Sequence, residues 1–263
     1  PWERGDPMFS VRAFLIVPML LIAATAARAG IVYNQPSDFP VSGAPGVYAS
    51  QNDNGPTGAG NFATAYDNFT LSQTTVIKGV TWQGAYFLPP NAGTGADAIT
   101  AFTLTFWSDN AGTPGVALLS QTIPGNANES FVGMETATTN GGNEVFNYFD
   151  NLPIPFTAVG GTQYWLSIVP NLFYEDAPLT DGQWGWHTGT GGDGESMQDF
   201  ETVTGDPTTL MRFTNPHDLA FSLSDTTVST VPEPASLAVW GLIGIAGGVY
   251  RWRRCNRPQA RRD

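Results

Sequence analysis

Within residues 30–225 the apolar side chains show no sustained helical spacing, and this constrains the fold more than any other feature of the sequence. Short runs that alternate apolar and polar side chains occur instead, separated by clusters of Gly, Pro, Asn and Asp. The clearest run, 99–107, has Phe102, Leu104 and Phe106 two residues apart. This period is typical of a β-strand with one buried face, because successive side chains point to opposite sides of a sheet. The region is therefore predicted to be all-β.

Several other runs repeat this pattern. The longest, 74–87, is predicted to place Val76 and Trp82 on one face of a strand. A break in that strand is expected at Gly79 or Gly84, because glycine inside a strand often marks a bulge. The remaining candidate strands are 69–71, 116–123, 145–149, 155–159, 163–169, 210–214 and 219–223.

The connections between these runs also indicate the fold class. Turn sequences such as 108–115 and 140–143 are rich in Asn, Asp and Gly, which favour tight turns. Many short strands without helical spacers predict a single antiparallel two-sheet sandwich over 30–225. We expect a jelly-roll-like topology for this sandwich.

The first 29 residues are interpreted as a secretory signal peptide with some upstream residues. Arg12 supplies a positive charge, and a short apolar run follows at 13–24. Ala27 and Ala29 then precede Gly30 and form an A-x-A cleavage site. A basic residue, a short apolar segment and small residues in this order are typical of export signals.

The C-terminal part shows three features in sequence. A polar linker, 226–231, leads into a Pro-Glu-Pro motif, an uncharged apolar stretch occupies 235–250, and an arginine cluster follows. The motif is Val231-Pro232-Glu233-Pro234-Ala235-Ser236, the arginines are Arg251, Arg253 and Arg254, and a basic tail spans 255–263. A helix over the sixteen apolar residues rises about 24 Å, which is short of the roughly 30 Å hydrocarbon core. We therefore expect a marginal membrane helix that its positive end holds in place.

This arrangement closely resembles the PEP-CTERM sorting signal of Gram-negative bacteria over residues 231–254. The resemblance implies export by the Sec route, transient anchoring in the inner membrane and recognition by an exosortase-type membrane enzyme. It implies that Pro232, Glu233 and Pro234 are substrate residues of that enzyme. It also implies delivery to the cell surface or extracellular matrix in bacteria that make exopolysaccharide and biofilm. The tail at 255–263 departs from the family, which usually ends soon after its arginines, and leaves an ordinary C-terminal anchor as the alternative.

The charge distribution limits the partners of the predicted ectodomain. Between residues 30 and 230 only Lys78 and Arg212 are basic, against nineteen Asp and Glu, so this part carries 2 − 19 = −17. Nucleic-acid binding needs clustered basic residues on a folded face, so no nucleic-acid partner is expected. An acidic surface also repels anionic polymers unless a cation bridges them.

Catalytic and metal-binding patterns are sparse. The chain has two His and one Cys, and no catalytic motif stands in a suitable context, so we expect neither an enzyme nor a cofactor. Asp193, Glu195, Asp199 and Glu201 are interpreted as a solvated acidic loop, with a glycosidase pair as the less favoured alternative. The glycine-rich loop 189–195 leaves weak Ca²⁺ binding open, although it lacks EF-hand spacing, and no specific metal site is assigned.

Aromatic residues provide the one candidate for ligand contact. Trp184 and Trp186 flank a glycine, and on an exposed loop they would stack on sugar rings; burial in the core is the alternative. Four other aromatic residues are expected in the core or between the sheets, namely Trp82, Tyr86, Trp107 and Trp165.

The ectodomain carries a looser resemblance to exported sandwich domains that are common among PEP-CTERM proteins, at 66–71, 79–82 and 102–109. This resemblance implies no activity. We therefore expect a non-enzymatic exported protein with a structural or adhesive role. A carbohydrate-binding module of the exopolysaccharide matrix is the main alternative, and a jelly-roll glycoside hydrolase or lyase is a further one.

Overall fold

A computed structural model describes residues 30–40, 46–53, 63–87, 99–135, 143–172, 183–201 and 210–227. In these ranges the chain is all-β, and none of them contains a helix long and apolar enough to cross a membrane. The predicted signal peptide, the sorting segment with its helix at 235–250 and the basic tail lie outside the described residues, as does the linker beyond residue 227.

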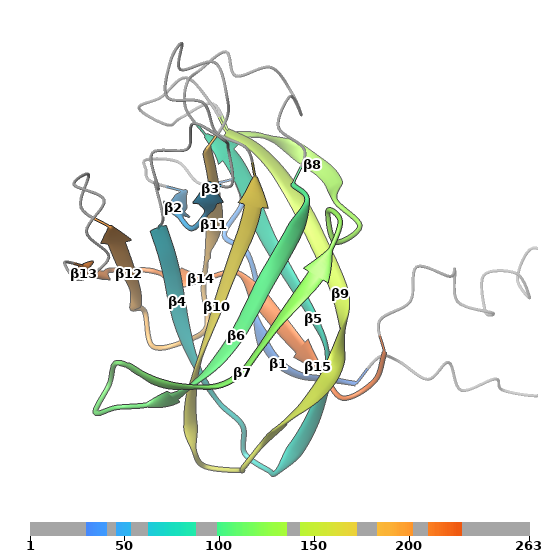
Figure 1. The fold of residues 1–263 in the computed structure, drawn as a ribbon, viewed down its shortest axis with the longest axis vertical. Coiled ribbons are helices and arrows are strands. Elements are labelled where there is room, and N and C mark those ends of the chain that lie inside the picture. The colour runs from blue at the N-terminus through green and yellow to red at the C-terminus, as the bar shows by residue number, and fades with distance from the viewer. Residues whose placement is uncertain are drawn as a thin grey trace, which may run out of the picture. The chain divides into compact units, whose positions relative to one another are not determined.

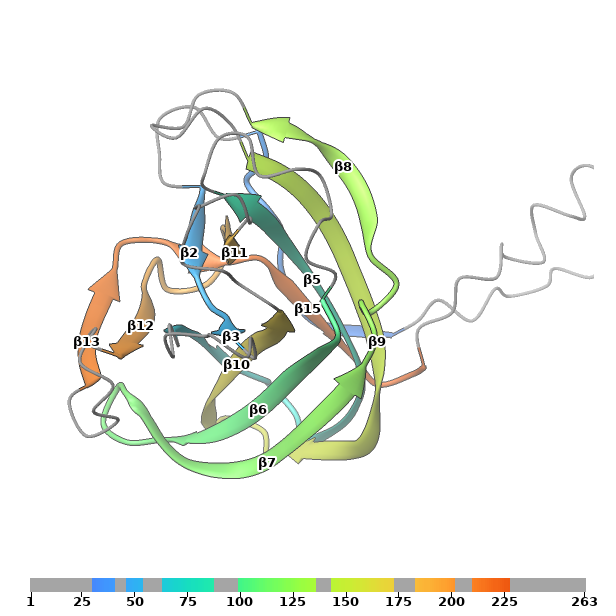
Figure 2. The same cartoon turned by 45° about the horizontal axis from the view of Figure 1, so that its top comes forward.

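The described strands form two sheets (Figures 1 and 2). The eight-stranded sheet contains β1 (Ile31–Gln35), β2 (Val47–Ala49), β5 (Thr75–Phe87), β8 (Ser130–Glu135), β9 (Asn143–Ala158), β11 (Gln183–Gly189), β14 (Asp218–Leu219) and β15 (Phe221–Ser224). The seven-stranded sheet contains β3 (Asn52–Asp53), β4 (Ala63–Thr70), β6 (Ala101–Asp109), β7 (Pro114–Pro124), β10 (Gln163–Leu172), β12 (Ser196–Glu201) and β13 (Leu210–Asn215). The named strands pair antiparallel, except for a two-residue parallel pairing of β3 with β10. The predicted class, two antiparallel sheets, is confirmed.

Strand β5 is the centre of the eight-stranded sheet. One of its edges pairs with β9 along most of its length. Its other edge pairs with β15 at residues 79–82 and then with β11 at residues 84–87. Two different strands therefore share one edge of β5, and the pairing partner of β5 changes from β15 to β11 at Gln83.

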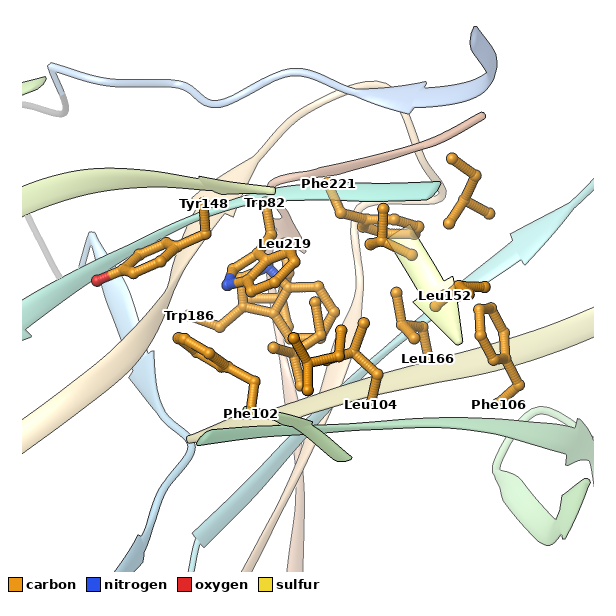
Figure 3. Packing of buried hydrophobic residues seen from close by; sticks show 14 of the residues in the cluster. Trp82, Phe102, Leu104, Phe106, Tyr148, Leu152, Leu166, Trp186, Leu219 and Phe221 are labelled. Carbon is orange, nitrogen blue, oxygen red and sulfur yellow. The ribbon is translucent and has the colours of Figure 1, made fainter. Parts of the chain in front are cut away.

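The core lies between the two sheets and is rich in aromatic rings. Trp82 and Tyr148 project from the eight-stranded sheet towards Phe102 of the other layer (Figure 3). The ring centroids of Trp82 and Phe102 are 5.0 Å apart, and the rings of Phe106 and Phe156 stack at 4.3 Å. Aromatic pairs at these separations add to the hydrophobic gain from burial, so they fix how the two layers face each other.

The predictions for 99–107 and 163–169 are confirmed, because these runs lie in β6 and β10 with their alternate residues in the core. The turn predicted at 108–115 is also confirmed: the Asp109 carboxylate accepts a hydrogen bond from the Gly112 backbone at 3.1 Å, and Gly112 has a φ of 81°. Glycine adopts this left-handed conformation without steric cost. Residues 140–142 of the other predicted turn lie outside the described residues. The runs 145–149 and 155–159 belong to one continuous strand, β9.

One detail of the strand predictions is wrong. Val76 is 42% exposed, whereas Ile77 and Trp82 are buried. The pairing of β5 is irregular between Ile77 and Gly79, and this irregularity exchanges the buried and exposed faces of the strand on its two sides. The break expected at Gly79 or Gly84 is therefore real, but its effect on Val76 was not anticipated. A bulge adds a residue to one strand and inverts the alternation beyond it.

The two ends of the described body are paired with each other. Strand β1 lies antiparallel to β15, with Ile31 opposite Ser224. The Asp225 N–H donates to the Gly30 carbonyl at 3.0 Å, and the Gly30 N–H donates to the Thr226 hydroxyl at 3.0 Å. The first and last described residues thus leave the sheet at the same place.

Candidate binding site

A pocket of about 390 Å³ opens on the outer face of the eight-stranded sheet. Strands β5, β9 and β15 form its floor, and the segment 34–37 forms one wall. It lies where β5 changes partner from β15 to β11, and there the Gln83 N–H bonds to the Ala220 carbonyl at 3.2 Å. The volume is within the usual range of small-ligand pockets, which is roughly 300–1,000 Å³.

The alternation of the strands explains the chemistry of this pocket. Because Trp82, Tyr148 and Phe221 point into the core, their sequence neighbours point outward. The outward neighbours are all uncharged. Phe149 is a half-buried ring and Ala220 is small and buried, and the others carry hydroxyl or amide groups: Thr81, Gln83, Asn147 and Ser222. Asn34, Gln35 and Ser37 complete the polar part of the lining, which contains no Asp, Glu, Lys, Arg or His.

Hydrogen bonds connect these side chains into a network. The Ser37 hydroxyl donates to the Gln83 side-chain oxygen, and Gln83 Nε2 donates to Asn147 Oδ1 at 3.0 Å. The hydroxyls of Thr81 and Ser222 bond to each other across the neighbouring strands β5 and β15. The Gln83 side chain is therefore held from both sides, and it is 8% exposed.

A buried ionisable cluster fixes the wall that carries Ser37. His187 of β11 is fully buried, and its Nε2 lies 3.0 Å from Glu135 Oε1 of β8. Its Nδ1 lies 2.8 Å from the Thr188 carbonyl, 3.3 Å from Ser37 Oγ and 3.5 Å from Asp38 Oδ1. The imidazole thus connects the segment 36–40 to β8 and β11.

Ser37, His187 and Glu135 lie in the order of a catalytic triad, but the geometry does not support base catalysis. The Thr188 carbonyl can only accept, so the His187 Nδ1 that faces it must carry a hydrogen. That nitrogen is the one near Ser37, so it cannot take the Ser37 proton. The other histidine, His217, lies elsewhere and bonds to the Tyr48 hydroxyl at 2.8 Å.

The structure corrects the placement of the two candidate sugar-binding tryptophans. Trp184 and Trp186 lie on β11 rather than on an exposed loop, and both are fully buried. The Trp184 indole donates to the Tyr148 hydroxyl at 3.1 Å, and the Trp186 indole donates to the Ala220 carbonyl at 2.9 Å. Both rings belong to the core, so the burial alternative holds and sugar contact by these two residues is ruled out in this conformation.

The other aromatic assignments hold in part. Trp82 and Tyr86 pack in or against the core and Trp165 is buried, as expected, but Trp107 and Trp165 do not belong to the cluster between the sheets. They alternate with the core residues of β6 and β10, so they lie on the outer face of the seven-stranded sheet. Trp165 is nonetheless 2% exposed, and its indole donates to Asp109 at 2.9 Å.

The acidic loop prediction is wrong for Asp199 and Glu201, which both belong to β12. Asp199 is 2% exposed and accepts two hydrogen bonds of 2.7 Å from Arg212. The guanidinium lies 5.8 Å from the centre of the Tyr66 ring. Glu175 and Asp176, the other carboxylate pair in the sequence, lie outside the described residues.

Carboxylates hold the glycine-rich loop to the sheets. Asp193 accepts from Asn68 Nδ2 at 2.6 Å and from the Glu195 N–H at 3.0 Å, and Asp218 accepts from the Gly192 N–H at 2.8 Å. In the part of the chain that the structure describes, no three His, Cys, Asp or Glu side chains are grouped so as to hold a metal ion. These contacts give the loop carboxylates a structural role, and Ca²⁺ binding there gains no support.

Asp67 connects the two sheets beside this loop. It is fully buried on β4 and accepts hydrogen bonds from the N–H groups of Leu219 and Asn68. Burial raises the pKa of Asp67 well above 3.8, because loss of water outweighs these two donors and the neighbouring Asp218 adds to the effect.

The predicted sorting residues cannot be placed. Residues 231–236, the three arginines, Ala27 and Ala29 lie outside the described residues, and Gly30 is described only as the first residue paired to the end of the body. Conversely, the pocket could not be predicted from the sequence, because Ser37, Gln83 and Asn147 are far apart along the chain. The only signal was the strand pattern, which assigns the residues between core positions to an outer face.

These observations define a class of protein: an antiparallel two-sheet β-domain with an uncharged polar pocket on one outer face. The family description of DUF7901, a domain of unknown function, matches residues 61–224. This match covers more than half of the chain, so the chain belongs to the DUF7901 family. The pocket floor lies within the matched range, whereas the wall at 34–37 precedes it. No curated protein matches the chain.

Proposed function

We propose that this chain is an exported, non-enzymatic protein that reaches the cell surface or extracellular matrix and has a structural or adhesive role there. One observation carries the proposal: the Pro-Glu-Pro motif, the apolar stretch at 235–250 and the arginine cluster follow one another in a chain whose first 29 residues fit the pattern of an export signal. This order supports Sec export, an intermediate anchored in the inner membrane and processing by an exosortase-type enzyme. The strongly acidic body supports the absence of nucleic acid among its partners.

The residues that line the pocket support a binding role and not a catalytic one. The lining of the described pocket contains no Asp, Glu, Lys, Arg or His, and the nearby His187 turns its hydrogen-bearing Nδ1 towards Ser37. A glycoside hydrolase needs two opposed carboxylic acids about 5–10 Å apart across its cleft. The lining offers no such pair, so the hydrolase or lyase alternative is not favoured.

The connections between the strands support the jelly-roll-like topology. The chain passes from one sheet to the other between β4 and β5, between β5 and β6, and at each step from β9 to β12. Hairpins interrupt this alternation at β6–β7, β8–β9 and β12–β13. We infer a variant of the jelly roll in which three hairpins widen the sheets.

The sorting proposal is tested in a host that carries an exosortase, with Glu233→Ala and the body variant Glu195→Ala as a matched control. The parent and the control are expected to lose the C-terminal segment and leave the membrane fraction, and Glu233→Ala is expected to stay in the membrane. Mass spectrometry of the surface fraction identifies the C-terminus. Intact parent protein that retains Cys255 at the surface would favour the ordinary anchor and contradict sorting.

Carbohydrate binding remains the second candidate function. The sequence suggested Trp184 and Trp186 as sugar contacts, and their burial removes that argument. The uncharged pocket on the eight-stranded sheet provides a different argument for carbohydrate binding.

A further inference from the structure

We propose that the pocket lined by Ser37, Gln83, Asn147 and Phe149 binds an uncharged sugar unit of a polysaccharide. This inference concerns the described body alone. It deepens the carbohydrate-binding alternative and does not depend on how the C-terminal segment is processed, so sorting and sugar binding can fail separately.

The polar groups of the pocket match the chemistry of sugar hydroxyls. A hydroxyl both donates and accepts hydrogen bonds, and a side-chain amide does the same through its NH₂ and carbonyl groups. Gln83 uses one N–H on Asn147 and its oxygen on Ser37, which leaves its second N–H for a ligand. Asn147 is exposed, its oxygen is occupied by Gln83, and no described residue accepts a hydrogen bond from its Nδ2. Two amide donors are thus available beside one another.

The ring of Phe149 supplies the apolar part of the site. It follows Asn147 on the same outward face of β9, two residues further along, and it is half-buried in the pocket lining. Sugar rings present a face of C–H groups as well as hydroxyls, so an aromatic ring beside amide donors contacts both kinds of surface. Ligand pockets generally combine apolar walls with a few placed polar groups.

Charge selects a neutral sugar over an anionic one. The lining contains no basic side chain that could pair with a carboxylate or sulfate group. The region 30–230 carries a formal charge of −17, and its two basic residues, Lys78 and Arg212, do not line the pocket. Arg212 is already bonded to Asp199 through two nitrogens. A uronic-acid polymer would meet repulsion without compensation, whereas a neutral hexose polymer would not.

The pocket is also held ready for a ligand. Ser37 orients the Gln83 amide, and the buried His187 lies within 3.3 Å of Ser37 on a segment that contacts β11. A site that is ordered before binding loses less entropy when the ligand arrives. Ser37 and His187 are therefore positioning residues in this proposal, and Asn147 and Phe149 contact the sugar.

Affinity gel electrophoresis of the purified full chain tests the proposal with three neutral polymers, a soluble β-glucan, a galactomannan and an arabinoxylan, and with alginate as the anionic polymer. The matched variants are Asn147→Ala and Asn110→Ala, since Asn110 is an exposed asparagine in the β6–β7 turn of the other sheet. At least one neutral polymer is expected to retard the parent and Asn110→Ala equally. Asn147→Ala and Phe149→Ala are each expected to weaken that retardation at least tenfold, and alginate is expected to have no effect.

Three results would overturn the proposal: no retardation by any of the neutral polymers, equal retardation of Asn147→Ala and the parent, or retardation by alginate alone. Thermal unfolding separates loss of binding from loss of fold. Phe149 is half-buried, so Phe149→Leu serves as the second variant if Phe149→Ala unfolds; it keeps apolar volume and removes the aromatic face. If Phe149→Leu binds like the parent, the ring contact is refuted.

Discussion

Replacement of His187 by leucine tests whether the buried imidazole holds the pocket wall. His187 and Glu135 are both essentially inaccessible to water, and Nε2 and Oε1 are 3.0 Å apart. His187→Leu leaves the Glu135 carboxyl facing an apolar side chain. Glu135 keeps its hydrogen bond from Asn143 Nδ2 at 3.1 Å, so the substitution removes one of its buried hydrogen bonds. Loss of one partner from a buried hydrogen bond costs about 1–3 kcal/mol.

The expected loss is large enough to measure directly. For a domain of this size, 1 kcal/mol changes the melting temperature by about 2–4 °C, so His187→Leu is expected to lower it by about 2–12 °C. Urea unfolding gives the free energy without extrapolation over temperature. The double variant His187→Leu/Glu135→Gln is expected to recover part of the loss, because a neutral amide is cheaper to bury than a carboxylate.

The reasoning would be refuted by either of two results. A loss below about 1 kcal/mol for His187→Leu would mean that the pair adds no more than an ordinary hydrogen bond. Strict additivity of the two substitutions would mean that the two side chains do not interact, because contacting residues normally show a coupling energy in a double-mutant cycle.

Two further predictions concern the core. Folding raises the pKa of Asp67 above 3.8. Above that pH the folded state keeps a proton that the unfolded state releases. The free energy of unfolding therefore falls as the pH rises towards the folded pKa, by up to about 1.4 kcal/mol per pH unit. Asp67→Asn is expected to flatten that part of the curve, which urea midpoints from about pH 4 upward will show; an unchanged slope would contradict the assignment. Gly84→Ala is expected to destabilise the fold by about 1–3 kcal/mol, because a Cβ at this position would overlap the Trp184 ring. Partial rescue by Trp184→Phe would support this explanation, and a neutral effect of Gly84→Ala in thermal unfolding would refute it.

Strand β6 could be predicted from the sequence because one of its faces is partly polar, whereas β11 could not. In β6 the threonines that alternate with Phe102 and Leu104 reveal the period of two. In β11 every residue from Trp184 to Gly189 is buried, so no alternation remains and the glycines suggest a loop. A strand covered on both faces carries no periodic signal of its own.

The candidate site was missed for a different reason. Gln83 and Asn147 are 64 residues apart in the sequence, and Ser37 is 46 residues from Gln83. Their meeting depends on which strands neighbour β5, and local patterns do not specify strand order. Moreover, Ser, Gln and Asn on the outer face of a sheet are usually solvated residues without a binding role. Here they line a pocket that lies where β5 changes its pairing partner at Gln83.

The pairing of β1 with β15 has a mechanical consequence. Because residues 30 and 225 leave the sheet together, tension applied between them would load the hydrogen bonds of the β1–β15 ladder one after another, as in peeling, rather than all at once in shear. Such a ladder yields at low force. The segment 34–37 continues from β1 into the pocket wall, so a pull that strips β1 from its neighbour would also dismantle that wall and release whatever the pocket holds.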